Sequence, residues 1–435
     1  SWLTDAVRFL LNLNSTRRTI LLSTWGLFTG LALLLITAGV FSTLVGIRAE
    51  LKHLPTLISG GITTAYYAGF LLGSWYTLRA LKQVGHIRVY AALASLLSAS
   101  ILIAGAYDSP LVWIIMRSST GFCFAGLYVV AESWLNGLAT NTFRGRLLAM
   151  YNVVTIGAYG VGQLLVFNFD ARTLTGFAFA AVVSSLAVIP VAISEQATTP
   201  HVENNTHITM RELAKIVPTG AGTILLVGLA HGGMLGMAVI FATREGLSIG
   251  RVGILIAAIN LGGMALTWPI SSASDDIDRR IIGVLSSLAV IVMGLLMLTQ
   301  TPSSWLTTAL LFAIGGFSFP LYAVGSAYTN DWVSPEQMGA AASQLVMLYG
   351  FGAMIGPLVA APFLDIIGTY GFAWSIISLH ALILLFLIYR IRAWNAPVTT
   401  KHWDDVSFHG RAFFIPATIV SLGVNRGSRK NKKLK

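Results

Sequence analysis

Long apolar runs, separated by short charged or Pro- and Gly-rich breaks, dominate this sequence. A helix needs roughly 20 mostly apolar residues to cross the hydrocarbon core of a bilayer. The runs predict twelve membrane spans, near residues 19-45, 55-78, 87-107, 111-135, 146-169, 173-194, 218-243, 250-273, 280-300, 304-330, 337-366 and 370-392. Only 10% of the residues are charged, against about 25% in soluble domains, so a soluble protein and a single-span anchor are both excluded.

The polar connector after the sixth span divides the chain into two halves. We expect an all-α integral membrane protein, with twelve transmembrane helices in two pseudo-symmetric six-helix bundles. The expected parts are a cytoplasmic N-terminal segment (1-18) able to form an interfacial helix, a first bundle (19-194), a cytoplasmic linker (195-217), a second bundle (218-392) and a basic cytoplasmic tail (393-435).

The distribution of Lys and Arg predicts the orientation, because basic residues are retained in the cytoplasm. With the N-terminus inside, 22 of the 28 Lys and Arg residues are cytoplasmic and five lie outside: Arg48, Lys52, Arg172, Arg244 and Arg251. Both termini are therefore expected in the cytoplasm. The basic tail directly follows a span, which favours membrane lipid over nucleic acid as its partner.

The two halves share a pattern where polar residues are densest. The fourth span ends in Glu132-Ser-Trp134 and the tenth in Asn330-Asp-Trp332. A glycine follows each, and 17 residues beyond it come Gly162 and Gly356 respectively. Six-helix repeats of this kind are the plan of many secondary transporters, with the substrate site between the halves.

Arg117 is the strongest functional signal, because an ionisable residue inside a span is costly and usually functional. It could hold a substrate anion, respond to protonation of a nearby carboxylate, or cap carbonyl groups of a neighbouring helix. Polar and aromatic residues recur at helical spacing on other spans and predict a central pathway. The predicted pathway residues are Arg117, Phe124, Tyr128, Asn152, Tyr159, Gln163, Tyr67, His231, Asn260, Tyr322 and Gln344.

Charges at the cytoplasmic ends of the fourth and tenth spans suggest ion pairs that form and break as the halves rock. Glu132 lies near Arg144 and Arg146, and Asp331 and Glu336 occupy the mirrored position. We expect these residues to act as a cytoplasmic latch.

His231 admits three interpretations: internal packing, contact with substrate or a proton, or a Cu(I) path with Met234, Met237 and Met264. The single cysteine, Cys123, excludes an internal disulfide and a Cys/His zinc box. No nucleophile elbow, P-loop or HExxH motif occurs, so we expect no enzyme activity and no cofactor.

Three stretches resemble one branch of a known family: VGHIRVYAAL (84-93), GFCFAGLYVVAESWLN (121-136) and RGRLLAMYNVVTIGAYGVGQLLV (144-166). They are similar to the YcaD-like branch of the major facilitator superfamily. The resemblance implies two six-helix bundles, alternating access, and a path lined by helices one, four, seven and ten.

Family motifs extend the resemblance. Arg117 and Gly121 match the RxxxG motif, which in proton-linked members is associated with coupling. The loop motif GxLaDRxGRR resembles WPISSASDDIDRR, which implies a latch role for Asp275, Arg279 and Arg280. The corresponding stretch of the first half, GSWYTLRALKQVGHIR, lacks the Asp.

These features predict a proton-coupled secondary transporter of a small organic solute in a bacterial cytoplasmic membrane, working as a monomer. Efflux is slightly favoured over uptake because the predicted path is rich in aromatic residues. Two alternatives remain open: a membrane partner or assembly factor that keeps the fold without transport, and copper uptake.

Overall fold

A computed structural model of the protein describes residues 15–138, 144–193, 208–334 and 337–393. These residues form helices and connecting loops, without any strand. Each of the twelve expected ranges contains a helix, which confirms the predicted fold class. Nine described segments are long and apolar enough to cross a membrane, and one of them, Ala340–Ala393, contains two successive helices. Residues 1–14 of the expected N-terminal segment and residues 394–435 of the expected basic tail lie outside the described residues.

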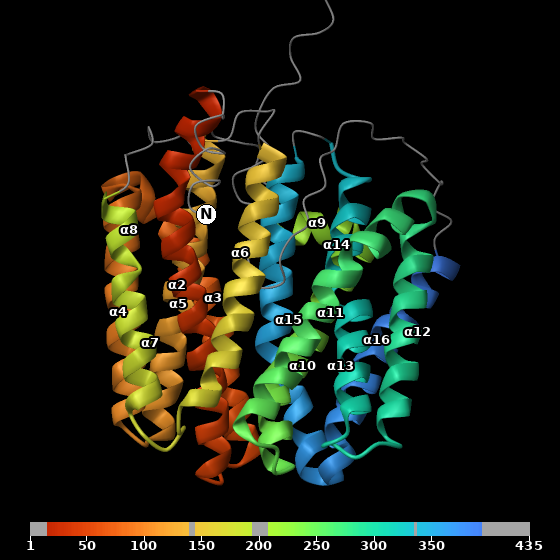
Figure 1. Ribbon diagram of the computed structural model, residues 1–435. Helices are drawn as coiled ribbons and strands as arrows, with labels where there is room; N and C mark the ends of the chain where they lie inside the picture. The colour runs from red at the N-terminus through yellow and green to blue at the C-terminus, as the bar shows by residue number, and fades with distance from the viewer. Residues whose placement is uncertain (1–14, 139–143, 194–207, 335–336, 394–435) are drawn as a thin grey trace, which may run out of the picture.

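Helices of the first half gather on one side of the molecule (Figure 1). They are α2 (Ser15–Leu51), α3 (Thr56–Val84), α4 (His86–Ala106), α5 (Pro110–Leu138), α6 (Arg144–Leu165), α7 (Thr175–Leu186) and α8 (Val188–Ile193). A short 3₁₀ turn, η1 (Val166–Asn168), follows α6. The sixth expected span is thus two helices, α7 and α8.

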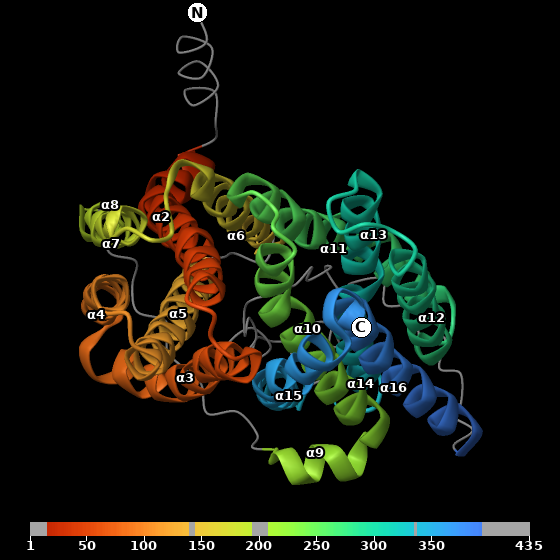
Figure 2. The ribbon, with the colours of Figure 1, turned by 90° about the horizontal axis from the view of Figure 1, so that it is seen from below.

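Helices of the second half gather on the other side (Figure 1). They are α10 (Pro218–Arg244), α11 (Ile249–Asp276), α12 (Arg279–Met297), α13 (Trp305–Ser318), α14 (Pro320–Asn330), α15 (Met338–Ile367) and α16 (Gly371–Ala393), with a 3₁₀ turn, η2 (Gly368–Tyr370), before α16. The view from below in Figure 2 places α4, α7 and α12 at the outside of the arrangement. Between the halves, α3 packs against α15, α6 against α11 and α2 against α10.

Local sequence sets several helix ends. The linker helix α9 (Met210–Ile216) begins with a capping box, in which Thr209 and Glu212 exchange side-chain and backbone hydrogen bonds. Pro218 follows at the first turn of α10, where its missing N–H is tolerated. Pro320 likewise begins α14, so the tenth expected span is broken into α13 and α14.

Glycines allow close helix contacts at equivalent places in the two halves. A Cβ at Gly162 of α6 would overlap the backbone of Ile36 in α2. In the second half, a Cβ at Gly356 of α15 would overlap the backbone of α10 at Leu229 and Gly233. Small residues permit such approach between transmembrane helices. The spacing that relates Gly162 to Gly356 in sequence therefore corresponds to the same helix contact, between spans one and five and between spans seven and eleven.

Not every glycine of α6 has this role. A Cβ at Gly157 or Gly160 would meet no neighbouring atom within 4 Å, so a methyl group there would enter open space. This difference allows a matched pair of substitutions to be made on one helix.

We expect Gly162→Ala to destabilise the protein by about 1–3 kcal/mol, because the overpacked helices α2 and α6 must move apart.

Gly157→Ala is the control, and we expect it to leave stability unchanged or slightly raised, because alanine favours the helix. Thermal unfolding of both purified variants in detergent checks the pair. Equal melting temperatures would contradict the close contact between α2 and α6.

Candidate functional site

Arg117, on α5, lies in an aromatic cluster formed by the first half. Its side chain is largely buried, at 9% exposure. The guanidinium carbon lies 4.6 Å from the centre of the Tyr66 ring on α3 and 5.4 Å from that of Phe41 on α2. Tyr67 packs edge-on against Tyr66, with ring centres 5.5 Å apart. Aromatic side chains from two neighbouring helices thus surround one buried cation, an arrangement that stabilises positive charge.

The aromatic cluster extends beyond Arg117 toward two further predicted residues. The Tyr159 hydroxyl on α6 lies 3.0 Å from the Ser42 hydroxyl on α2. Phe70 on α3 lies between Tyr66 and Tyr128, with ring centres 6.0 and 6.3 Å away. Among the described side chains, no carboxylate forms an ion pair with Arg117 and none accepts a hydrogen bond from it. Within the described part of the chain, the Arg117 guanidinium therefore contacts the faces of aromatic rings.

His231, on α10, belongs to a buried hydrogen-bonded chain in the second half. Its Nε2 lies 2.9 Å from the Ser318 hydroxyl at the end of α13. That hydroxyl lies 2.7 Å from Nε2 of His380 on α16. Both imidazoles are fully buried. Both histidines therefore share the hydroxyl of Ser318.

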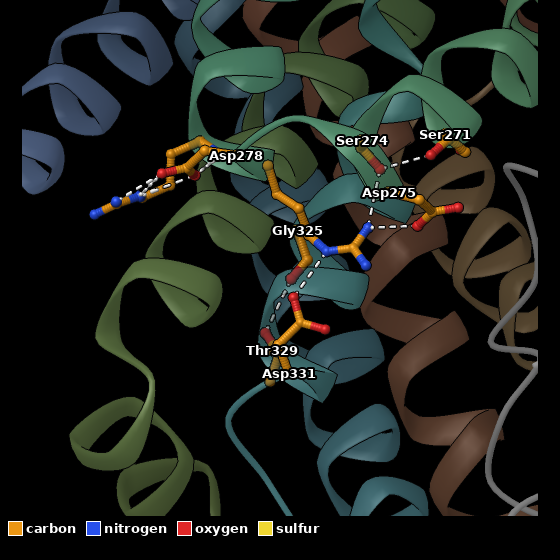
Figure 3. Close-up of polar contacts among 9 residues, drawn as sticks. Ser271, Ser274, Asp275, Asp278, Gly325, Thr329 and Asp331 are labelled. Carbon is orange, nitrogen blue, oxygen red and sulfur yellow. Dashed lines mark hydrogen bonds and ion pairs between the residues drawn. The ribbon is translucent and has the colours of Figure 1, made fainter. Parts of the chain in front are cut away.

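Four predicted latch residues, Asp275, Arg279, Arg280 and Asp331, lie at one end of the second half. Figure 3 shows the polar contacts around Asp275, Asp278 and Asp331. The Arg279 Nε–H group donates to Asp331, 2.8 Å away, while Nη1 donates to Asp275 at 3.1 Å and to Ser274 at 2.9 Å. Arg280 instead pairs with Asp278, 2.7 Å away, which also caps α12. Asp275, Arg279 and Asp331 therefore join α11, α12 and α14.

The first half forms a neutral counterpart of this link. His86 begins α4 as Arg279 begins α12, and its Nε2 lies 2.9 Å from the Ser133 hydroxyl on α5. Ser133 and Asp331 are the middle residues of the two repeated tripeptides. The ring of His86 also packs edge-on against Trp134. Equivalent positions thus carry a His–Ser contact in one half and an Arg–Asp ion pair in the other.

An ionic cluster that joins the two halves lies at the opposite end. Arg244, at the end of α10, contacts Glu50 at 3.1 Å on α2 and Asp365 at 3.3 Å on α15. Its Nη2 donates to the Thr56 hydroxyl, 2.7 Å away on α3. Thr56 also donates to Asp365. In the sequence, Arg244 is marked only as an outside basic residue, because its partners come from three other helices.

Two loop carboxyls have lowered pKa values. A hydrogen bond from Lys52 lowers the pKa of Asp108, against the raising effect of partial burial, and Arg48 adds to the lowering. Burial raises the pKa of Asp278, but hydrogen bonds from the Arg280 side chain and backbone outweigh it. Both carboxyls therefore remain ionised at neutral pH and hold these loops.

The remaining predicted pathway residues are spread through the cores of both halves. Phe124, Tyr128 and Tyr67 are buried in the first half. The Asn260 amide donates to the Ile256 carbonyl of its own helix. Tyr322 packs edge-on against Tyr349. Gln163 is buried where α6 meets α2 and α11, and Gln344 is half-buried on α15.

Some predicted residues cannot be placed. Glu336 lies outside the described residues, as do the side chains of Glu132, Arg144, Arg146 and Asn152. The three methionines of the copper hypothesis lie in different surroundings: Met234 and Met237 are buried, whereas Met264 is 47% exposed. Among the described residues, no group of three or more His, Cys, Asp or Glu side chains could hold a metal ion.

The family model and the relatives that this chain matches all belong to one superfamily of transporters. Residues 220–424 match the family model of the Major Facilitator Superfamily. The MFS-type transporter YcaD of Escherichia fergusonii is 27% identical over 376 residues, covering 86% of this chain and 97% of that relative. YcaD of Salmonella heidelberg is 26% identical over 339 residues, covering 77% of this chain and 87% of the relative.

Solved transporter structures share the fold. The nucleoside transporter NupG superposes with a TM-score of 0.69 at 12% identity, covering 86% of this chain and 99% of that one. A bacterial homologue of the human lysosomal transporter Spinster, in an inward-facing conformation, gives a TM-score of 0.67 at 14% identity, covering 87% and 96%. At these identities the likeness concerns the fold alone.

The two links at the starts of α4 and α12 generate one prediction. Asp331→Asn removes a charge-assisted contact and is expected to cost about 1–3 kcal/mol of stability, because Arg279 keeps its charge in a partly buried place. Ser133→Ala removes a hydrogen bond without a formal charge and is expected to cost about 0.5–1.5 kcal/mol. Thermal unfolding of the two variants compares them, and a larger loss in Ser133→Ala would overturn the ranking.

The ionic cluster around Arg244 generates another prediction. Arg244→Gln removes the charge that holds Glu50 and Asp365 together, so the ends of α2 and α10 are expected to separate. Spin labels at His53 and Ser248, in a Cys123→Ser background, report the distance across this end. We expect a shift toward longer distances in Arg244→Gln.

Arg251→Gln is the matched control, because the described contacts of Arg251 are with Ser303, Trp305 and Thr308 of its own half. It should leave the distance distribution unchanged. An unchanged distribution in Arg244→Gln would show that the cluster does not hold this end closed.

Proposed function

We propose that the chain is a membrane transporter of the major facilitator superfamily, like YcaD, and that it moves a small organic solute by alternating access, coupled to protons and in the direction of efflux. The proposal places it in a bacterial cytoplasmic membrane, with both termini in the cytoplasm. The observation that carries it is Arg117, a buried cation surrounded by aromatic rings from α2 and α3.

The surroundings of Arg117 favour a solute with a negatively charged group. An uncompensated charge at membrane depth is costly. A carboxylate bound beside the guanidinium would supply the missing counter-charge through charge-assisted hydrogen bonds. The rings of Tyr66, Phe41 and Phe70 offer apolar contact for the rest of the solute, so an aromatic monocarboxylate fits the cluster best. This aromatic character also supports efflux of amphipathic compounds.

The ionic cluster around Arg244 supports alternating access. It joins α10 and α15 of the second half to α2 and α3 of the first. In the predicted orientation this end faces the outside of the cell, so the cluster would close the outer end of the pathway. Arg244 and Asp365 are 30% and 45% exposed, and exposed ion pairs contribute only about 0–1 kcal/mol each. The cluster can therefore hold one conformation without preventing the other. A bound solute with a preference for the outward state could supply the difference.

Proton coupling has support from two places. Arg117 and Gly121 occupy the RxxxG positions associated with coupling in the family. In the second half, two imidazoles share a buried serine, and imidazole is the side chain that ordinarily titrates near neutral pH. The two sites lie in different halves, so rocking of the halves can link anion binding to proton binding.

Matched ligands test the proposal. We expect aromatic monocarboxylates to raise the melting temperature of the purified protein, and their neutral carboxamides to leave it unchanged. At a ligand concentration about 100 times the Kd, the stabilisation would be about 2.7 kcal/mol. Arg117→Gln should abolish the shift, whereas Arg172→Gln, on an exposed loop of the same half, should keep it.

Flux completes the test. In proteoliposomes with an imposed pH gradient, wild-type protein and Arg172→Gln are expected to move the stabilising carboxylate, and Arg117→Gln is expected to be inactive while folded. Equal stabilisation by carboxamide and carboxylate would contradict an anionic solute. Flux that ignores the pH gradient would contradict proton coupling.

A further inference from the structure

Three helices of the second half meet at one serine hydroxyl. Ser318 ends α13, His231 lies in the middle of α10, and His380 lies in the middle of α16. All three side chains are fully buried. Two imidazoles bound to one hydroxyl in a membrane-embedded core are costly to pack unless each hydrogen bond is made. The donor and acceptor of each hydrogen bond in this group therefore have to be identified.

Acceptor groups at both ends determine the direction of the hydrogen bonds. Nδ1 of His380 lies 2.8 Å from the Ile376 carbonyl, which can only accept, so Nδ1 carries a hydrogen. In neutral His380, Nε2 is then the acceptor, and the Ser318 hydroxyl donates to it. Nε2 of His231 lies close to both the hydroxyl and the carbonyl oxygen of Ser318, at 2.9 and 3.2 Å, so it is the donor. The chain runs from His231 through Ser318 to His380.

The break between α13 and α14 makes this chain possible. Pro320 begins α14, and the N–H of Tyr322 donates to the Phe319 carbonyl rather than to Ser318. The Ser318 carbonyl is thereby left to the imidazole of His231. Broken membrane helices supply backbone groups to binding sites in this way.

We propose that His231, Ser318 and His380 form a single proton-binding site, which takes up one proton through His231 and holds it on His380. This inference rests on the proton coupling proposed above and assigns it to particular atoms. Nε2 of His231 gives its hydrogen to the Ser318 oxygen, and the Ser318 hydrogen passes to Nε2 of His380. His231 takes the incoming proton at Nδ1. His231 ends as the opposite neutral tautomer and His380 as an imidazolium.

His380 is the end of the path because its other nitrogen already donates to the Ile376 carbonyl, which also stabilises the imidazolium. The site holds one proton rather than two, because two buried imidazolium ions bonded to one oxygen would repel strongly. Among the described residues, the titratable groups that face the site include Tyr349 on α15, whose ring centre lies 5.8 Å from that of His231. Tyr322 on α14 and Tyr67 on α3 lie near Tyr349. Tyr67 belongs to the first half, beside Tyr66 and Arg117, so the proton site is linked to the proposed anion site through two tyrosines.

Nitrogen-15 spectra of the histidines test the site directly. The full-length protein, labelled at its eight histidines, is measured in liposomes from about pH 8 to about pH 5. Signals of His231 and His380 are assigned by their loss in His231→Gln and His380→Gln. We expect His231 to change tautomer and His380 to become imidazolium in the same step. Ser318→Ala should abolish this common step, whereas Ser287→Ala, a fully buried serine bonded to its own helix, should preserve it.

Two outcomes would overturn the inference: both imidazoles staying neutral in fixed tautomers throughout, or an unchanged common step in Ser318→Ala. The result is independent of transport. Titration of the site without any pH-driven carboxylate flux would refute the proposed function and leave the proton site standing. Proton-driven flux with silent histidines would refute this inference alone.

Discussion

The structure depends on one constraint: polar and charged groups inside a membrane must find their partners within the protein. Many serines and threonines, and Asn260, bond to carbonyls of their own helices. Three ionisable groupings have other partners. Arg117 lies among aromatic rings, His231 and His380 share Ser318, and Arg279 pairs with Asp331. These are the places where the core holds groups that could change partner or charge, and they are where function is proposed.

The two halves keep one plan and differ in its chemistry. Gly162 and Gly356 permit the same helix contact in each half, and Ser133 and Asp331 occupy the same position of a repeated tripeptide. The charged version of the link lies in the second half and its neutral version in the first. The buried cation lies in the first half, and the buried imidazole pair in the second. In the proposed function, this division gives each half a separate ligand, the solute anion in the first and the proton in the second.

The sequence was sufficient to predict the positions of the membrane spans. Long apolar runs predict the helices, and the resemblance of WPISSASDDIDRR to a family motif implies a latch role for Asp275 and Arg279. The pairing of Arg279 with Asp331 is known from the structure alone. The sequence was insufficient where distant helices meet. Nothing local marks Glu50, Thr56 and Asp365 as partners of Arg244, or Ser318 as the link between two histidines. Those contacts depend on how the helices pack against one another. The spacing of residues along a single helix does not contain that information.

The central claim is that anion binding at Arg117 and proton binding in the second half belong to one transport cycle. Electrophysiology of proteoliposomes on a solid-supported membrane measures both together. A concentration jump of an aromatic monocarboxylate should give a transient current whose size depends on pH, and this current should be absent with the carboxamide and in Arg117→Gln. A current that is independent of pH, or one that persists in folded Arg117→Gln, would contradict the account.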